Sequence, residues 1–222
     1  ASEELDIILT GKDCGLEERA PMCGVPYHSC EAYIARLVEK GHKVAICEQM
    51  ENPAAAKGIV KRDVVRIVTP GTVIESNMLD ESKNNYLASV FLSDKNCGLA
   101  FIDISTGEFF IGKTADILDD MVRLSPAEII YPFSSAEQDK ILQLRDIFKT
   151  TPVFEKLYIR TDIEQIVSRV FGGAMRSDLM PTNVANAVCL LAGYLFNTQR
   201  DATITFRAPY TFKSGRQLLI DS

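Results

Sequence analysis

The sequence predicts an α/β protein in two parts, and two observations lead to this prediction. From residue 86 onward, three apolar stretches joined by short turns are followed by alternating helical and strand-like stretches, which is the order of an α/β fold. Before residue 73 the pattern is less regular, with one amphipathic helical stretch and two short strands between proline-containing loops. The first part is therefore expected to be a small mixed α/β unit.

In the first part, residues 5–9 form an apolar segment with almost nothing before it to pair with, so we expect an N-terminal portion of this unit to be missing. Residues 10–19 are polar and contain two glycines, which indicates a loop. Residues 21–27 hold two prolines five positions apart, which favours a rigid, shaped loop.

A helix is predicted to begin at Ser29, which is a good N-cap residue, and to end at Gly41. Short strands are predicted at 43–47 and 64–68, the second ending at Pro70-Gly71. The buried face of the helix has the spacing expected of one amphipathic side and consists of Tyr33, Ile34, Leu37 and Val38.

The second part begins with three predicted strands at 86–92, 98–104 and 108–111, joined by turns rich in Ser, Asp, Asn and Gly. We then predict a helix from 114 or 115 to 124, a strand at 128–131, a helix at 135–147, a strand at 153–158 and a helix at 162–171. A last long helix starts at 181 with a buried stripe of Val184, Ala187, Val188, Leu191 and Leu195. This order predicts a ribonuclease H-like fold.

Four segments follow from this pattern. We expect a first domain over 1–72, a polar linker over 73–83 centred near Asp80, and a ribonuclease H-like domain over 84–215. The tail from Phe206 looks like an exit segment, with residues 216–222 leading into a further domain.

The composition limits the possible functions. The 222 residues carry a net charge of −6, which argues against a protein that binds nucleic acid with its whole surface. No apolar run approaches the roughly 20 residues that span a bilayer, and Glu3 and Glu4 do not fit a cationic signal sequence. One local stretch is basic: four cations against one acid lie between Lys57 and Arg66. Such a stretch either faces phosphates or is a solvated loop.

Six cysteines occur, and none forms a Cys-x-x-Cys pair. Cys23 and Cys30 flank His28, but a zinc site would need Cys14 or a distant residue as its fourth ligand, and the spacing fits no zinc pattern. We therefore expect no metal site and reduced thiols of the kind found in the cytosol.

No catalytic motif stands out. A phosphate-binding Gly-x-x-x-x-Gly-Lys-Ser/Thr loop and a Gly-x-Ser-x-Gly elbow are both absent. A ribonuclease H fold raises the possibility of a two-metal nuclease, but its candidate acids have ordinary structural explanations, so we expect the fold without the chemistry and no enzyme in this chain. These acids are Asp103, Glu108, Glu128 and Asp162.

Several separate blocks resemble one family. The blocks PMCGVPYH (21–28), KVAICEQ (43–49) and VVRIVTPGT (64–72) are similar, in order and spacing, to the N-terminal domain of MutS proteins of bacterial DNA mismatch repair. The block IDISTGEF (102–109) resembles the connector domain of the same family, and Ile220-Asp221-Ser222 resembles the start of its lever domain.

The resemblance implies a mismatch sensor that works as a dimer on kinked double-stranded DNA. In that family a Phe-x-Glu element wedges an aromatic ring beside the mispair, and mispairs unstack cheaply enough for such a wedge to select them. The connector is implied to relay the signal to the ATPase and to contact the partner protein MutL. A bacterial, cytoplasmic and nucleoid-associated location follows from the same resemblance.

The family pattern also implies what this sequence lacks. The wedge motif precedes the segment corresponding to residues 5–10, so we expect the wedge to be absent here, together with the lever, clamp and ATPase regions. ATP and Mg²⁺ are then implied for the full-length protein only, with no cofactor in this chain, and dimerisation is implied to use regions outside it.

Support for DNA is expected from the loop beside the minor groove and from cations that contact phosphates, each adding salt-dependent and sequence-blind affinity. For Met22, a position in the core is an equally good alternative. The expected DNA-contacting residues are Lys12, Pro21, Met22, Gly24, Lys57, Lys61, Arg62 and Arg66.

Overall fold

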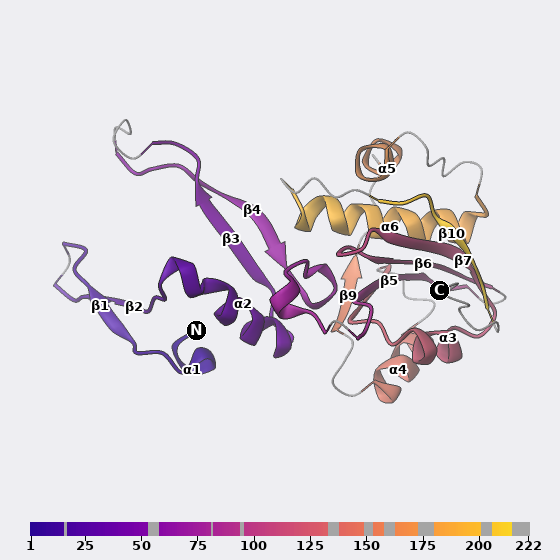
Figure 1. Ribbon diagram of the computed structural model, residues 1–222, viewed down its shortest axis with the longest axis horizontal. Coiled ribbons are helices and arrows are strands. Elements are labelled where there is room, and N and C mark those ends of the chain that lie inside the picture. Colours follow the sequence, from indigo (N-terminus) through magenta and orange to yellow (C-terminus); the bar gives the residue numbers. More distant parts are fainter. Residues whose placement is uncertain are drawn as a thin grey trace.

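The computed structural model describes residues 1–15, 17–52, 58–80, 82–93, 96–132, 138–148, 153–157, 163–172, 180–200 and 206–214. A small first unit with long arms lies beside a compact α/β body (Figure 1). Among the described residues, no helix has the length and apolar character needed to cross a bilayer.

The first unit is built from two helices, the first of them a single turn, and two antiparallel strand pairs. Helix α1 (Ser2–Leu5) precedes the hairpin of β1 (Thr10–Lys12) and β2 (Ala20–Met22), and α2 (Cys30–Glu39) follows a 3-10 turn, η1 (Tyr27–Ser29). Strands β3 (Val44–Gln49) and β4 (Arg62–Val68) form a ribbon with a register shift at Ile46/Cys47. Figure 1 shows this ribbon extending away from the α/β body.

One local prediction for this unit needs correction, and a second is confirmed in part. Residues 10–12 pair with residues 20–22 and are not loop; strands of three residues are too short to show the apolar alternation by which a strand is recognised. Ser29 is the N-cap residue of α2 as predicted, but its hydroxyl donates to the carbonyl of Pro26 and does not cap the helix. The predicted helix end is confirmed: Gly41 has φ 80° and donates its N–H to Val38 O.

The second unit is a six-stranded mixed sheet in the order β10-β7-β6-β5-β8-β9. Strands β5 (Tyr86–Phe91), β6 (Cys97–Asp103) and β7 (Glu108–Thr114) form the predicted antiparallel meander, and β8 (Glu128–Pro132) and β9 (Val153–Leu157) continue it in parallel beside β5. This is the expected ribonuclease H-like α/β order.

Helices cover both faces of the sheet (Figure 1). Helices α5 (Ile163–Phe171) and α6 (Thr182–Thr198) lie on one face, and α3 (Ile117–Leu124) and α4 (Gln138–Ile147) lie on the other. The two resulting cores are separate: Leu191 and Ile102 belong to the first, and Met121 and Phe101 to the second. Close approach of α6 to the sheet requires Gly98, where a Cβ would stand 1.9 Å from the carbonyl oxygen of Asn183.

Two further predictions for this unit are corrected. Residues 210–213 form a sixth strand, β10, parallel to β7, instead of an exit segment. Its pairing is fixed by tertiary contacts such as Phe212 against Phe101, with ring centroids 5.5 Å apart, which the local sequence does not reveal. Helix α3 begins at Ile117 and not near Thr114, because Thr114 completes β7 and Asp116 caps the helix by accepting from the N–H of Asp119.

Residues 73–80 pack onto the first unit. Val73 is buried, and Met78 at the end of the 3-10 turn η3 (Ser76–Met78) and the following Leu79 pack against the small core of Val38 and Val68. The path between the two units is therefore held in place by apolar contacts.

Candidate functional site at the joint between the two units

A short turn at the root of the ribbon forms the centre of the joint. Thr69 caps the 3-10 turn η2 (Pro70–Thr72): the N–H of Thr69 donates to Thr72 Oγ1, and the two hydroxyl oxygens lie 2.9 Å apart. Pro70 in the first helical position suits such a start. Thr69 and Thr72 are both fully buried, so the turn has one fixed shape and offers its polar groups to the second unit.

Glu128, the first residue of β8, accepts hydrogen bonds from this turn. Its Oε2 lies 2.6 Å from Thr69 Oγ1 and 3.1 Å from the amide nitrogen of Gly71, and its Oε1 lies 2.5 Å from the hydroxyl of Tyr194 on α6. The side chain is fully buried. Burial raises the pKa of the Glu128 carboxyl, although the hydrogen bonds from Thr69, Tyr194 and Gly71 oppose that rise. One carboxyl group thus joins the ribbon root, the sheet and α6.

Arg66 makes a second connection. Its guanidinium pairs with Glu75 at 2.6 Å, donates to the carbonyl of Thr72 at 3.1 Å, and reaches Gln199 Oε1 at the end of α6 at 3.1 Å. Burial raises the pKa of Glu75, but the hydrogen bond and charge of Arg66 outweigh it, so the pKa ends below its usual value. Gln199 Nε2 also donates to the carbonyl of Ile67.

More exposed ion pairs surround these contacts. Lys43 at the start of the ribbon pairs with Glu155 on β9 at 2.5 Å, and Arg200 lies 3.6 Å from Asp63. Such pairs contribute at most about 1 kcal/mol each. The buried groups of Arg66 and Glu128 therefore determine how the first unit sits on the second.

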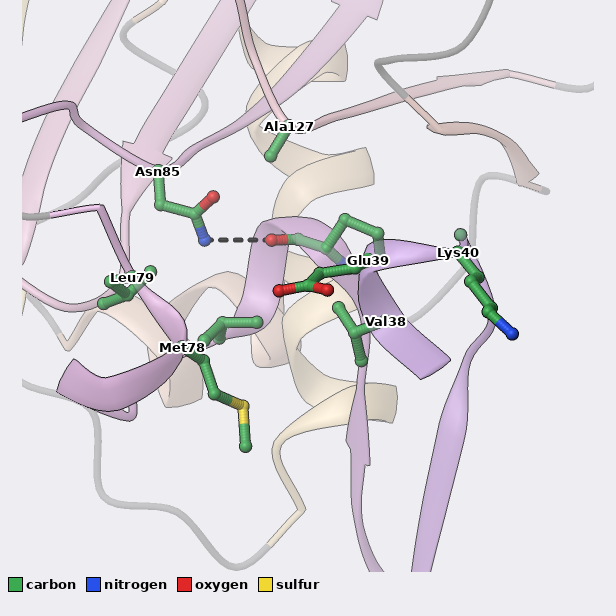
Figure 2. A pocket seen from close by; sticks show the side chains of 10 residues that line it. Val38, Glu39, Lys40, Met78, Leu79, Asn85 and Ala127 are labelled. Carbon is green, nitrogen blue, oxygen red and sulfur yellow. Dashed lines mark hydrogen bonds between the residues drawn. The ribbon is translucent and has the colours of Figure 1, made fainter. Parts of the chain in front are cut away.

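A cleft of about 630 Å³ opens beside the joint (Figure 2). Its wall is formed by the end of α2, η2, η3 and the start of the second unit, and Asn85 donates to the carbonyl of Pro70 across it at 2.9 Å. Figure 2 shows Lys40 pointing away from the cleft, whereas Glu39 and Asn85 contribute polar groups to its lining. The apolar lining residues are Val38, Pro70, Val73, Met78, Leu79 and Ala127.

The residues predicted to contact DNA fall into two arms that project from the same end of the molecule (Figure 1). Lys12, Pro21 and Met22 lie on the β1–β2 hairpin, and Gly24 follows it. Met22 is 45% exposed, so the alternative of a core methionine does not describe this structure. Lys61 and Arg62 are exposed at the far end of the ribbon. Lys57 lies outside the described residues.

Arg66 stands apart from these arms. It belongs to the same basic stretch, yet its guanidinium is turned into the joint and already engaged by Glu75, Thr72 and Gln199. The sequence singles out Glu128 only as a candidate nuclease acid, and it does not point to Thr69, Tyr194, Glu75 or Gln199. One signal was available for them: Glu128 opens an otherwise apolar strand, and a buried charge in such a place requires partners.

Three of the candidate nuclease acids lie in the described part of the chain and have structural contacts, those of Glu128 being the ones at the joint. Asp103 accepts hydrogen bonds from the N–H of Asn85 and from the N–H and hydroxyl of Ser105, and so shapes the turn between β6 and β7. Glu108 lies 3.9 Å from Arg207, and Asp162 lies outside the described residues. Within the described part of the chain, no three His, Cys, Asp or Glu side chains are grouped to hold a metal ion, and all six cysteines are unpaired.

Comparison with known families gives two adjacent matches. Residues 1–77 match the family model described as MutS domain I, and residues 85–207 match the one described as MutS domain II. Together they cover most of the chain, and the contacts of the joint run between residues of the first match and residues of the second.

Individual relatives agree with this. A protein of Lachnoclostridium phytofermentans named "DNA mismatch repair protein MutS" is 41% identical over 237 aligned positions, covering 100% of this chain and 25% of that protein. Proteins with the same name from Clostridium perfringens and Acetivibrio thermocellus are 44% and 60% identical, over 90% and 59% of this chain. The chain spans about a quarter of the length of such relatives.

Proposed function

The chain belongs to the MutS family of DNA mismatch repair, and on this premise we propose that it supplies the DNA-recognition unit and the connector of a mismatch sensor. The first unit lies against double-stranded DNA that contains a mispair. The connector passes the resulting change of position to an ATPase elsewhere in the full-length protein and to MutL.

The observation that carries this proposal is the pair of arms on the unit that matches MutS domain I. Lys61 and Arg62 at the ribbon end offer cations to phosphates, and the β1–β2 hairpin with Lys12, Pro21 and Met22 offers an exposed surface for the minor groove. Cations of this kind bind the DNA backbone irrespective of sequence. Lys57 belongs to the same proposal; Arg66 is proposed mainly as a residue that orients the ribbon.

The wider setting is proposed from the family. ATP and Mg²⁺ act in other parts of such proteins, and we assign this chain no cofactor, no metal and no catalytic step. Dimerisation is assigned to regions outside these residues, and the working location to the bacterial cytoplasm and nucleoid.

Fluorescence anisotropy with matched and G·T duplexes at low salt tests DNA binding. The chain should bind both duplexes weakly and equally, because its 222 residues contain no Phe-x-Glu sequence. A clear preference for the G·T duplex would contradict the proposal that a Phe-x-Glu element is needed to select mispairs.

A pair of double variants tests the ribbon. K61A/R62A removes two cations from the ribbon end and should weaken binding while lowering the slope of log K against log salt by about 1.8, or about 0.9 for each lost phosphate contact. K113A/K213A is the matched control, because it removes two cations from neighbouring exposed positions on β7 and β10. Equal weakening in both variants would mean that the ribbon is not the contact.

A second candidate function is a protein-interaction module that docks MutL without significant DNA binding. The large α/β body, which matches MutS domain II, favours it. Crosslinking of the full chain to MutL, followed by mapping of the linked residues, tests this candidate. Crosslinks confined to residues 86–213, together with no DNA binding at low salt, would favour it over the leading proposal.

A further inference from the structure

We propose that Glu128 is a positioning residue that works as a neutral carboxylic acid: in this form it fastens the first unit to the connector, and its ionisation opens the joint. The proposal rests on the assignment of the first unit to DNA recognition, since it concerns how that unit is held.

The geometry around Glu128 favours a neutral group. The carboxyl is fully buried, and the three groups within hydrogen-bond distance are all uncharged: the Thr69 hydroxyl, the Gly71 amide and the Tyr194 hydroxyl. A buried carboxylate without a cation among its direct partners carries a large desolvation cost. Loss of the acid proton therefore disfavours the closed joint.

The hydrogen bonds close consistently in the neutral form. With an ionised Glu128 the Thr69 hydroxyl donates to Oε2 across the 2.6 Å contact. In the proposed neutral form this contact is reversed, so that the acid hydrogen is donated to Thr69 Oγ1, Thr69 donates to Thr72 Oγ1, and Thr72 donates to the carbonyl oxygen of Ile67, 3.4 Å away. The Gly71 N–H and the Tyr194 hydroxyl still donate to the two carboxyl oxygens. Every buried polar group in this chain of contacts keeps a partner, so protonation of Glu128 leaves none of them unpaired.

The surrounding charges do not reverse this preference. Lys43 beside β3 lies near Glu128 and lowers its pKa, but Lys43 is paired with Glu155 of β9. Burial raises the pKa of Tyr194 on α6, and the charge of Glu128 adds to that rise. Arg66, which reaches the carbonyl of Thr72, is paired with Glu75.

Protonation of Glu128 and closure of the joint are thus linked. In an open joint Glu128 meets water and has the ordinary pKa of a glutamate, near 4.5, while burial raises the pKa in the closed joint. When the pH is above the ordinary glutamate pKa, Glu128 loses its proton in the open joint, and this stabilises the open joint relative to the closed one. The ratio of closed to open joints therefore falls by up to roughly tenfold per pH unit, until the pH passes the pKa that Glu128 has in the closed joint. Below the ordinary value the ratio is constant.

Amide hydrogen exchange at Gly71, measured by NMR without DNA between about pH 5 and about pH 9 and corrected for intrinsic rates, tests this linkage. Because no DNA is present, the outcome is independent of whether the chain binds it. Glu128→Gln is isosteric with the neutral acid, and Glu128→Ala removes the contacts. Glu108→Gln is the matched control, since Glu108 also opens a strand but lies away from the joint.

Protection of Gly71 should fall with pH in the unaltered chain and in E108Q, and should be independent of pH in E128Q. The infrared band of a protonated carboxyl group should be present at about pH 5.5, where exposed carboxylates are mostly ionised, and absent from E128Q. Equal pH dependence of the unaltered chain and E128Q, or protection that rises with pH, would overturn the proposal. These readouts decide the matter even if E128A does not fold.

Discussion

Gly71 lies directly against Glu128. A Cβ on Gly71 would stand 2.8 Å from the Cβ of Glu128 and 3.1 Å from its Oε2. The turn and the first residue of β8 therefore meet with no space for even one methyl group, which places the turn and the buried carboxyl at a fixed separation.

Gly71→Ala should push the turn away from Glu128. We expect a loss of about 1–3 kcal/mol in the free energy of unfolding, as for other insertions into packed sites, and faster amide exchange at Thr72. Urea unfolding measures the first quantity. Gly24→Ala is the control, because a Cβ there meets nothing within 4 Å; an equal loss in both variants would contradict the close contact.

Arg66→Ala should destabilise the chain by about 2 kcal/mol, between the values for exposed and for fully buried pairs. Its side chain is 14% exposed, and its removal leaves Glu75 without its cation. Arg66→Lys should recover only part of the loss, because an ammonium group does not reproduce the fork that reaches Glu75, Thr72 and Gln199. Full recovery by lysine would show that charge alone is needed.

The same pair has a pH signature. Since Arg66 holds the pKa of Glu75 below its ordinary value of 4.5 against the opposing effect of burial, the pair stabilises the chain above that value. This contribution should disappear as the pH falls through the lowered pKa, and Arg66→Ala should lack it. Unfolding free energies measured from about pH 6 down to about pH 3 test this; parallel curves for both proteins would refute it.

Gly98→Ala should be the most damaging single methyl addition in the second unit. The new Cβ would lie 1.9 Å from Asn183 O in the backbone of α6, so the helix must shift, at a cost of about 3 kcal/mol or more. Ser89→Ala, which removes a buried hydrogen bond to the carbonyl of Ala187 on the same helix, should cost only about 1 kcal/mol. Thermal unfolding ranks the two variants, and the opposite order would contradict the close approach.

Thiol reactivity should divide the cysteines by burial. Burial raises the pKa of the Cys189 thiol to about 11, so at pH near 8 almost none of it is thiolate. Cys97 is buried as well, whereas Cys14 and Cys47 are exposed. Brief alkylation followed by mass spectrometry should label Cys14 and Cys47 first; early labelling of Cys189 would show that α6 is not packed as described.

Periodic segments were predictable from sequence. The meander strands and α6 carry long apolar patterns, so their type and approximate position follow from local spacing. Strands β1, β2 and β10 are short and lack such a pattern, and only distant partners such as Phe110 and Phe101 give β10 its place.

The joint was harder to predict for the same reason. Glu128 is 59 residues from Thr69 and 66 from Tyr194, and local composition does not encode such separations. Arg66 belongs to a basic stretch, and this charge led to the prediction that it contacts phosphates. Its side chain instead contacts Glu75 and Gln199, and the position of Gln199 depends on the packing of the second unit. Lys61 and Arg62 are exposed at the ribbon end, and their contact with DNA phosphates stays a prediction.

The ribbon of β3 and β4 is held at its root beside Thr69 and extends from there to a distant end. Strand β4 has seven residues, which at about 3.3 Å per residue gives an arm of roughly 23 Å. A rotation of about 10° at Thr69 would carry the far end through roughly 4 Å, about the spacing of one base pair step along a duplex. A small rotation at the buried root would therefore move Lys61 and Arg62 by more than it moves the residues of the joint.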